Sequence, residues 1–345
     1  MSKKILVTGG AGYIGSHTAV ELQKDGFDIV IIDNLANSDI EVLDRIKKIT
    51  GVKPEFIKLD LTDDKKVKKF FNGRNDIDSV IHFAALKAVG ESVEKPLMYY
   101  KNNILGLINL LDGILWSDNK INFIFSSSCA VYGQPDKLPA TEKTPIKKAE
   151  SPYGNTKQIS EEIINDVVNS RDGKIRAVFL RYFNPIGAHE SGLIGELPKG
   201  APLNLVPYVT QTAAGIREYI KVYGNDYQTP DGTGIRDYIH VVDLAKAHTA
   251  ALKRLLENKN KFNVEIFNLG TGKGSSVLEI IKTFERVNNI KASYKIVERR
   301  LGDIAEVWAD ASLANRELGW IAEKSLGDAL RDAWNWEKKY RGINL

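Results

Sequence analysis

Short apolar runs alternate with amphipathic segments of helix length in the first half of the chain. The run at residues 28–33 contains four consecutive aliphatic residues, a pattern typical of a parallel strand whose two faces are both covered by helices. The alternation predicts an α/β fold, a doubly wound parallel (Rossmann) sheet with right-handed crossovers. The expected strands are 5–8, 28–33, 55–60, 79–84, 122–127 and 176–182, and the expected helices are 16–24, 40–49, 65–71, 97–115 and 152–168.

The alternation breaks after residue 185. Residues 186–202 are rich in glycine and proline and show no periodicity, which predicts a loop that leaves the sheet. We then expect a helix at 205–216 and a strand at 219–223. A strand at 237–241, a helix at 242–256 and a strand at 265–269 are expected to rejoin the sheet region. Helices around 299–303 and an aromatic-rich helix at 326–340 complete the chain. The predicted domains are therefore 1–185, to which 237–270 return, and a smaller interleaved C-terminal lobe, 186–345.

Composition narrows the class of protein. The single cysteine, Cys129, excludes an intrachain disulfide and indicates a reducing compartment. No apolar run approaches the ~20 residues of a membrane span, and the N-terminus lacks a signal-peptide pattern. The basic run at 65–69 contains no aromatic residue and is interpreted as a solvated helix face rather than a nucleic-acid patch. We therefore expect a cytoplasmic protein with neither a membrane nor a nucleic acid as partner.

A glycine-rich segment, GGAGYIG at residues 9–15, connects the first expected strand to the first helix. Glycines permit a tight turn and close backbone approach, and the helix N-terminus offers N–H groups to a pyrophosphate. Asp33 ends the next strand, where a carboxylate binds ribose hydroxyls and repels a 2′-phosphate. The arrangement predicts NAD binding, whereas a simple turn at Asp33 and Asn34 would not explain the glycines. Asp60, which ends the third strand, either binds the adenine or caps the next helix.

Tyr153 and Lys157 are four residues apart at the expected start of a helix, with Ser151 as N-cap and Pro152 at its first position. Residues spaced by four share one helix face, so the phenol and the ammonium converge on one ligand. A neighbouring cation lowers the pKa of a phenol and makes it a better base. Ser128 follows a strand and is expected to hydrogen-bond the substrate oxygen that Tyr153 deprotonates. Alone, the YxxxK spacing is common by chance and usually structural, and the serines alone would favour a loop that caps its own backbone.

Together these residues resemble the extended short-chain dehydrogenase/reductase family and, within it, the UDP-glucose 4-epimerases. The resemblance extends over nearly the whole chain and is carried by HFAALKAVGES at 82–92, YYKNN at 99–103, RYFNP at 181–185 and GTGIRDYIH at 232–240. It implies a galactose-metabolism isomerase that inverts C4 of a UDP-hexose reversibly through a 4-keto intermediate, with bound NAD. It also implies a homodimer, for which the helix at 97–115 is either an interface or core.

The resemblance further implies that residues 1–185 bind NAD and 186–345 bind the UDP-sugar. The expected catalytic residues are Tyr153, Lys157 and Ser128. The expected cofactor-binding residues are Gly9, Gly12, Tyr13, Ile14, Gly15, Asp33, Asn34, Asn37, Ser38, Asp60, Leu61, Phe83, Ala84, Lys87, Asn102, Ser126, Tyr153, Lys157 and Phe183. The expected substrate-binding residues are Lys87, Ser128, Tyr153, Asn184, Asn204, Leu205, Tyr223, Arg236, Arg300, Asp303 and Val307, with the two arginines on the diphosphate and Asp303 on the uridine ribose.

Two positions depart from the pattern of the epimerases. Leu203 stands where these enzymes often carry Asn, and its side chain lacks the polar group for the contact that Asn makes there. Val307 stands beside the sugar, where some relatives carry Tyr and others a small residue. Because Val is smaller than Tyr, we expect room for a 2-acetamido group and hence UDP-GlcNAc and UDP-GalNAc as further substrates.

Two other functions are weighed against epimerisation. A nucleotide-sugar 4,6-dehydratase shares the fold, the cofactor and the Ser, Tyr and Lys set, but needs an acid and a base directly after the residue matching Ser128. Cys129 and Ala130 stand there instead. A non-catalytic NAD-binding module would need neither this set nor the paired arginines. The five histidines lack the spacing of metal ligands, so no metal is expected.

Overall fold

The computed structural model describes residues 2–117, 119–170, 174–300 and 304–343. Its main sheet is parallel throughout, with the strand order β10-β6-β5-β4-β1-β2-β3. β1 therefore lies between β2 and β4, and the chain winds away from it in both directions, which is the switch point where doubly wound folds bind ligands. The predicted doubly wound fold is confirmed. The strands are β1 (Lys4–Thr8), β2 (Asp28–Asp33), β3 (Glu55–Lys58), β4 (Ser79–His82), β5 (Ile121–Ser126), β6 (Ile175–Tyr182) and β10 (Val264–Leu269).

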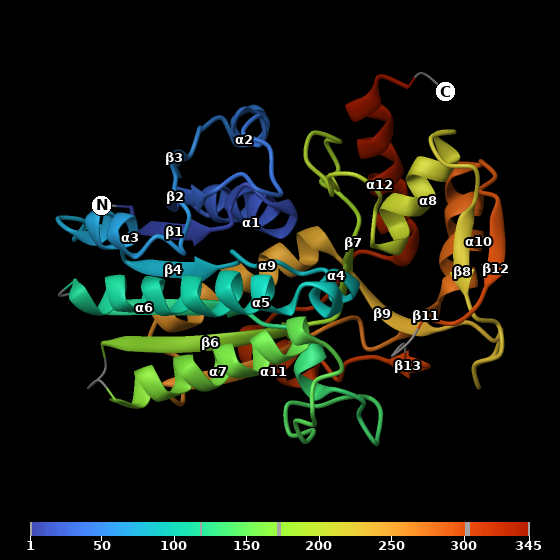
Figure 1. The fold of residues 1–345 in the computed structure, drawn as a ribbon. Helices are drawn as coiled ribbons and strands as arrows, with labels where there is room; N and C mark the ends of the chain where they lie inside the picture. Colours follow the sequence, from blue (N-terminus) through green and yellow to red (C-terminus); the bar gives the residue numbers. More distant parts are fainter. Residues whose placement is uncertain (1, 118, 171–173, 301–303, 344–345) are drawn as a thin grey trace.

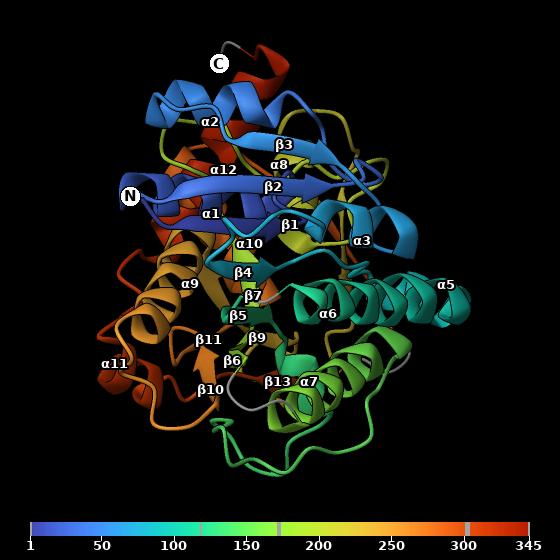
Figure 2. The same cartoon turned by 90° about the vertical axis from the view of Figure 1, so that its left-hand side faces the viewer.

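Helices cover both faces of this sheet, as Figure 2 shows with the strands between the two helical layers. The aliphatic side chains of successive strand residues enter the two opposite layers, which explains why the strands are apolar throughout. One layer contains α1 (Tyr13–Lys24), α2 (Val42–Thr50), α9 (Val241–Leu256) and α11 (Ser312–Leu318). The other contains α3 (Asp64–Phe71), α6 (Gly106–Trp116) and α7 (Pro152–Ser170).

The helix expected at 97–115 is broken into three parts. α5 (Pro96–Tyr100) continues into a π-helical turn (Lys101–Leu105), which continues into α6. A short helix that the pattern did not predict, α4 (Val89–Glu94), precedes them. Single π-helical turns inside α-helices are frequent at functional sites, and this one contains Asn102 and Asn103.

A second group of elements lies at one end of the main sheet in Figure 1. A small sheet joins β7 (Asn184–Ile186), β9 (Ile235–His240), β11 (Gly274–Ser276) and β13 (Glu306–Val307), and β8 (Ile220–Tyr223) pairs with β12 (Tyr294–Val297). α8 (Leu205–Ala213), α10 (Val277–Asn288) and α12 (Leu326–Arg341) pack around them. Capping boxes at Ser276–Glu279 and Ser325–Asp328 begin α10 and α12, respectively.

Two expectations about this region are wrong. The strand expected at 237–241 does not rejoin the main sheet, because β9 pairs with β7, β11 and β13 instead. Of the strands described after residue 186, β10 is the one that joins the main sheet, and α9 precedes it. The elements described on either side of 299–303 are strands β12 and β13 rather than helices. Short strands paired across long sequence separations leave little local pattern.

The surface of α3 agrees with the interpretation of its basic run. Lys66 and Lys68 form ion pairs with Asp63 and Asp64, one helical turn away. In the part of the chain that the structure describes, no helix is long and apolar enough to cross a membrane.

Candidate active site

The glycine-rich segment forms a tight cradle between β1 and α1. Gly9 has a positive φ of 70°, and a Cβ there would lie 2.7 Å from the backbone nitrogen of Ala84. A Cβ on Gly15 would lie 2.4 Å from the carbonyl oxygen of Gly9. Gly12 is the N-cap of α1 and has no side chain to cap the first N–H groups of the helix. These features fit a phosphate group held by backbone N–H groups at a helix N-terminus.

Asp33 links the end of β2 to the glycine cradle. Its Oδ2 accepts a hydrogen bond from the backbone N–H of Ala11 at 3.1 Å. Its Oδ1 accepts from the N–H of Leu35 at 2.8 Å and from the hydroxyl of Ser38 at 2.7 Å. The carboxylate therefore does begin a turn, as the alternative interpretation had it, but it also fixes the cradle.

Asp60 organises the loop after β3. Its carboxylate accepts a hydrogen bond from the Asn34 side chain at 3.0 Å and from the backbone and hydroxyl of Thr62 at 2.9 and 2.7 Å. The idea that Asp60 caps the following helix is wrong, because Asp63 is the N-cap of α3. Asn34 and Asp60 thus lie side by side at the carboxyl edge of β2 and β3.

Tyr153 and Lys157 share one face at the start of α7, as predicted. The Ser151 hydroxyl accepts a hydrogen bond from the N–H of Gly154 at 3.1 Å, which caps the helix. The Lys157 ammonium lies 6.0 Å from the centroid of the Tyr153 ring. It donates a hydrogen bond to the carbonyl of Ser126, the last residue of β5, at 2.7 Å.

Burial shifts the pKa values of both Tyr153 and Lys157. It raises the pKa of Tyr153, while a hydrogen bond with the Ser128 hydroxyl opposes the rise. Burial also lowers the pKa of Lys157 to about 8, against the charge of Glu161. Ser128, Tyr153 and Lys157 are thus brought together at the carboxyl edge of the sheet, with Tyr153 a phenol that needs a nearby cation to become a base.

A buried network supports this group from below. Ser127 donates a hydrogen bond to Oε1 of Glu161 at 2.5 Å. The guanidinium of Arg181 donates hydrogen bonds to both oxygens of the same carboxylate, at 2.9 and 2.5 Å. The hydroxyls of Ser126 and Tyr182 lie 2.6 Å apart. The network fixes α7 against the ends of β5 and β6.

The loop between β7 and α8 contacts two residues expected to bind the cofactor, Tyr13 and Lys87. The Tyr13 hydroxyl donates a hydrogen bond to the carbonyl of Gly187 at 2.6 Å. Lys87 and Asn204 both donate to Oε1 of Glu196, at 3.1 and 2.6 Å. Lys87, expected to bind both cofactor and substrate, and Asn204, expected to bind the substrate, therefore share the carboxylate of Glu196.

Four predicted substrate positions lie on or beside the small sheet and the β8–β12 pair. The guanidinium of Arg236, in β9, donates hydrogen bonds to the carbonyls of Ile235 and Ile304, both at 2.8 Å. The guanidinium carbon of Arg300 lies 3.9 Å from the centroid of the Tyr223 ring. Val307 pairs with Arg236 across the strands and is packed in a buried cluster with Phe183. Asp303 lies outside the described residues.

The remaining predicted positions surround the same edge of the sheet. Asn37 is exposed in the loop after β2, Asn102 donates a hydrogen bond to Asn103 at 2.9 Å, and Asn184 begins β7. The others are Ile14, Leu61 and Phe183, which are buried, and Phe83, Ala84 and Leu205, which are half-buried.

Comparisons with known proteins agree with this geometry. The family model described as GDP-mannose 4,6 dehydratase matches residues 6–333. The chain is 51% identical to a UDP-glucose 4-epimerase from Haemophilus influenzae over 338 residues, which is 97% of each chain. The chain belongs to the UDP-glucose 4-epimerase family. Solved UDP-glucose 4-epimerases superpose closely, one from Stenotrophomonas maltophila with bound NAD and formylated UDP-arabinopyranose (TM-score 0.93, 47% identity, 99% of each chain). Another is from Bifidobacterium longum with NAD⁺ and UDP (TM-score 0.93, 48% identity, 98% of this chain and 99% of that one).

Membership of this family agrees with the residues after Ser128. Cys129 and Ala130 lie in a short 3₁₀ turn (Cys129–Tyr132), and neither carries the carboxylic acid that a 4,6-dehydratase needs. Burial raises the pKa of the Cys129 thiol to about 12, so it stays protonated near neutral pH. The match to the dehydratase model therefore reflects the shared fold, glycine cradle and Ser, Tyr and Lys set rather than a shared elimination.

Residues that the sequence did not single out also shape the site. Asn103 accepts from the N–H of Leu86, donates to the carbonyl of the same residue, and donates to the hydroxyl of Thr156, at 2.8, 3.0 and 3.0 Å. It thereby joins the segment after β4 to α7. Glu161, Arg181 and Glu196 are equally unmarked by local patterns. Only the YYKNN and RYFNP segments could have drawn attention to Asn103 and Arg181.

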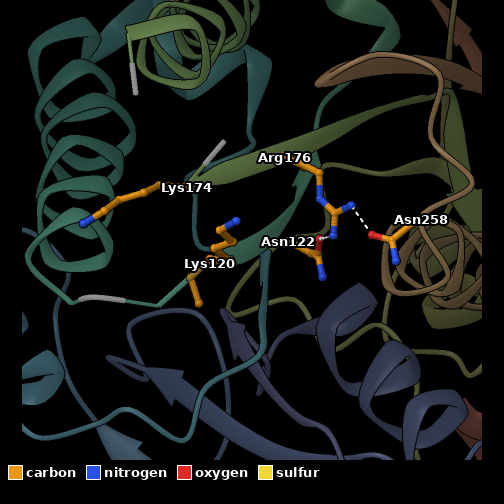
Figure 3. Close-up of a pocket in the computed structure, with 6 residues that line it drawn as sticks. Lys120, Asn122, Lys174, Arg176 and Asn258 are labelled. Carbon is orange, nitrogen blue, oxygen red and sulfur yellow. Dashed lines mark hydrogen bonds between the residues drawn. The ribbon is translucent and has the colours of Figure 1, made fainter. Parts of the chain in front are cut away.

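The described residues also include a pocket away from this site and no metal-ligand cluster. A pocket of about 200 Å³ opens at the opposite edge of the sheet, near the starts of β5 and β6, where Arg176 donates hydrogen bonds to Asn258 and Asn122 at 2.6 and 2.8 Å (Figure 3). Among the described residues, no three His, Cys, Asp or Glu side chains are grouped as metal ligands.

Proposed function

We propose that this chain is an NAD-dependent UDP-glucose/UDP-galactose 4-epimerase. The observation that carries the proposal is the convergence of Ser128, Tyr153 and Lys157 at the carboxyl edge of the main sheet, next to the glycine cradle. Arg236, in β9, and Arg300, after β12, would supply cations for a diphosphate. The names of the relatives support the same reaction.

The residues around the cradle fit a dinucleotide. Gly9, Gly12 and Gly15 leave room for a pyrophosphate at the start of α1, and Asp33 suits the adenosine ribose of NAD. Asn34, Ser38 and Asp60 suit the adenine end, and Lys87, Ser126 and Phe183 the nicotinamide end. Bound NAD⁺ supplies the acceptor for the C4 hydride and the donor that returns it.

The side chains supply the proton chemistry. The Tyr153 phenolate takes the proton of the sugar 4-hydroxyl, and Ser128 hydrogen-bonds the same oxygen as it becomes a carbonyl. The Lys157 ammonium stabilises the phenolate. The 4-keto sugar then turns about its link to the diphosphate, which Arg236 and Arg300 hold in place. Tyr153 returns the proton to the 4-oxygen after C4 has been reduced on its other face.

The division of labour follows the two groups of elements. We propose that residues 1–185, with α9 and β10, form the NAD-binding domain, and that the rest of 186–345 forms the UDP-sugar lobe. Asn184, Asn204, Leu205 and Tyr223 would line the uridine side, together with Asp303.

Val307 widens the proposed substrate range. Its side chain, 5% exposed, lies beside Arg236 and packs with Phe183. A tyrosine at this position would reach further into the sugar site. The valine therefore supports turnover of UDP-GlcNAc and UDP-GalNAc as well.

Product analysis tests both parts of this proposal. Purified protein is incubated with UDP-galactose and, separately, with UDP-GalNAc, and the products are identified by chromatography. Formation of UDP-glucose supports the proposed reaction, whereas NAD binding without turnover of either sugar would leave only a binding module. A stable 4-keto-6-deoxy sugar would instead indicate a dehydratase. Val307→Tyr is expected to abolish turnover of the acetamido pair alone.

An apolar surface on α4 to α6 supports a homodimer. Val93 is 61% exposed, Leu97 75% and Leu105 42%, all on consecutive helical segments beside α7. Exposed apolar groups on neighbouring turns mark protein contact surfaces, and a second copy of the chain is the partner we propose. Light scattering tests this, with Leu97→Glu expected to shift the mass toward a monomer.

The cytoplasmic location suggested by the single cysteine stays a prediction.

A further inference from the structure

Glu196 lies where the cofactor side and the nucleotide side of the site meet. Its Oε1 accepts hydrogen bonds from Lys87, in the segment after β4, and from Asn204, at the start of α8. The carboxylate is 13% exposed. One oxygen atom thus joins the segment after β4 to the N-cap residue of a helix in the other lobe.

The backbone around Glu196 is fixed on several sides. The indole N–H of Trp336, in α12, donates to the carbonyl of Glu196 at 3.1 Å. Gly195 lies against the same ring, because a Cβ there would be 2.4 Å from it. Lys199 donates to the carbonyls of Leu35 and Ala36 at 3.0 and 2.8 Å, which ties the loop to the turn after Asp33. The carboxylate is therefore held by a rigid support.

The partners of Glu196 are not in their most ordinary local arrangements. Asn204 is the N-cap of α8, where an asparagine side chain usually accepts a hydrogen bond from the helix, but it makes no such bond. Its amide donates to Glu196 instead. The Lys87 ammonium lies 5.6 Å from the centroid of the Tyr13 ring, at the start of α1 beside the glycine cradle. Both side chains are thus held by the same carboxylate.

We propose that Glu196 is a positioning residue that holds Lys87, on the cofactor side, and Asn204, on the uridine side, in place for binding of the nucleotide sugar. This inference rests on the proposed epimerase function. Long side chains lose conformational entropy when a ligand immobilises them, and a partner that has already fixed them reduces this cost. Glu196 reaches no reacting atom in this role. Its removal should therefore affect binding rather than the chemical step.

The test compares Glu196→Gln and Glu196→Ala with Glu190→Gln. Glutamine has the same shape and still accepts from Asn204, but it is a weaker partner for an ammonium. Glu190 is a matched control because it lies in the same loop, is 72% exposed in its side chain, and has Lys324 at 3.9 Å. The NAD-loaded proteins are assayed for kcat and KM with UDP-galactose, and for the Kd of UDP by calorimetry.

We expect Glu196→Ala to raise KM and the Kd of UDP roughly tenfold, Glu196→Gln less, and both to change kcat by less than about threefold. Glu190→Gln should match the wild type. In a Lys87→Met background the Glu196→Gln effect should shrink, since most of it acts through the lysine.

Other outcomes overturn the proposal. An unchanged or lower Kd would mean that the carboxylate is neutral toward the binding of UDP or opposes it. A lower kcat at constant KM, or an undiminished effect beside Lys87→Met, would rule out positioning through Lys87. If the wild type binds UDP but turns over no sugar, the epimerase assignment fails and the Kd comparison still decides on Glu196. If the wild type does not bind UDP, both fail.

Discussion

The ammonium group of Lys157 donates a hydrogen bond to the backbone carbonyl of Ser126 at 2.7 Å, which joins α7 to the end of β5. The same ammonium lies 4.8 Å from the centroid of the Phe125 ring and 6.0 Å from that of Tyr153. A buried cation is costly unless it is paired or hydrogen-bonded. Here it is held by one carbonyl and aromatic faces rather than by direct contact with a carboxylate, which keeps its charge available to the phenol.

Activity is expected to fall above about pH 8. Burial lowers the pKa of Lys157 to about 8 from 10.5, so the ammonium that favours the Tyr153 phenolate is lost as pH rises through this value. Steady-state kcat/KM for UDP-galactose, measured from pH 6 to 10, should show this alkaline limb. Arginine does not deprotonate in this range, so any residual activity of Lys157→Arg should lack the limb. An identical limb in that variant would assign it to another group.

Folding stability is expected to change in the opposite direction over the same interval. Since the pKa of Lys157 is lower in the folded than in the unfolded chain, the unfolded state binds more protons between about pH 8 and the ordinary value of 10.5. The contribution of this group therefore raises the free energy of unfolding as pH rises through that window. Urea unfolding of the wild type and Lys157→Met at pH 7.5 and 9.5 isolates it. The contribution is contradicted if the difference between the two proteins is the same at both pH values.

The buried Arg181–Glu161 pair should be important for stability. The side chains are 3% and 7% exposed, and Arg181→Met would leave the Glu161 carboxylate buried beside Ser127. Loss of one partner of such a pair costs about 3–5 kcal/mol. Arg74→Met removes a more exposed arginine, 24% accessible in its side chain, from Glu55 and should cost less than about 1 kcal/mol. Equal losses in urea unfolding would show that burial does not govern the effect.

The close packing around the glycine cradle predicts that a side chain at Gly15 cannot be accommodated. Alanine at Gly15 would place a Cβ 2.4 Å from the Gly9 carbonyl, and backbone atoms cannot move aside cheaply. We expect Gly15→Ala to lose NAD binding and to lower the melting temperature. Gly90, which is helical and has nothing within 4 Å of a Cβ, is the control, since alanine there should be neutral or slightly stabilising. NAD fluorescence and thermal unfolding measure both effects, and wild-type NAD affinity in Gly15→Ala would contradict the proposed cradle.

Local patterns were sufficient for the main sheet but not for the second group of elements. Parallel strands such as β2 are buried on both faces and therefore carry an aliphatic run that is visible in the sequence. β13 has only two residues and pairs with β9 about seventy positions earlier, so its sequence carries almost no signal. The same holds for the site. Tyr153 and Lys157 are fixed by helical spacing, whereas Glu196 reaches Lys87 only through tertiary folding.

The adjacent arginines Arg299 and Arg300 offer a matched comparison for substrate binding. Each guanidinium stacks on a tyrosine, Arg299 at 4.0 Å from the Tyr227 centroid and Arg300 at 3.9 Å from that of Tyr223. They differ in charge partner, because Arg299 donates to the carboxylate of Asp226 at 2.7 Å.

Of these two arginines, only Arg300 is proposed to bind the diphosphate. Arg300→Met should therefore raise the KM for UDP-galactose and the Kd of UDP by roughly 10- to 100-fold, the value of a charge-assisted hydrogen bond. Arg299→Met should leave both within about threefold and only slightly lower stability, because its ion pair is exposed. Calorimetry with UDP and steady-state kinetics on the two variants decide between the residues. Equal effects, or a larger effect at Arg299, would reassign the phosphate contact to the other arginine.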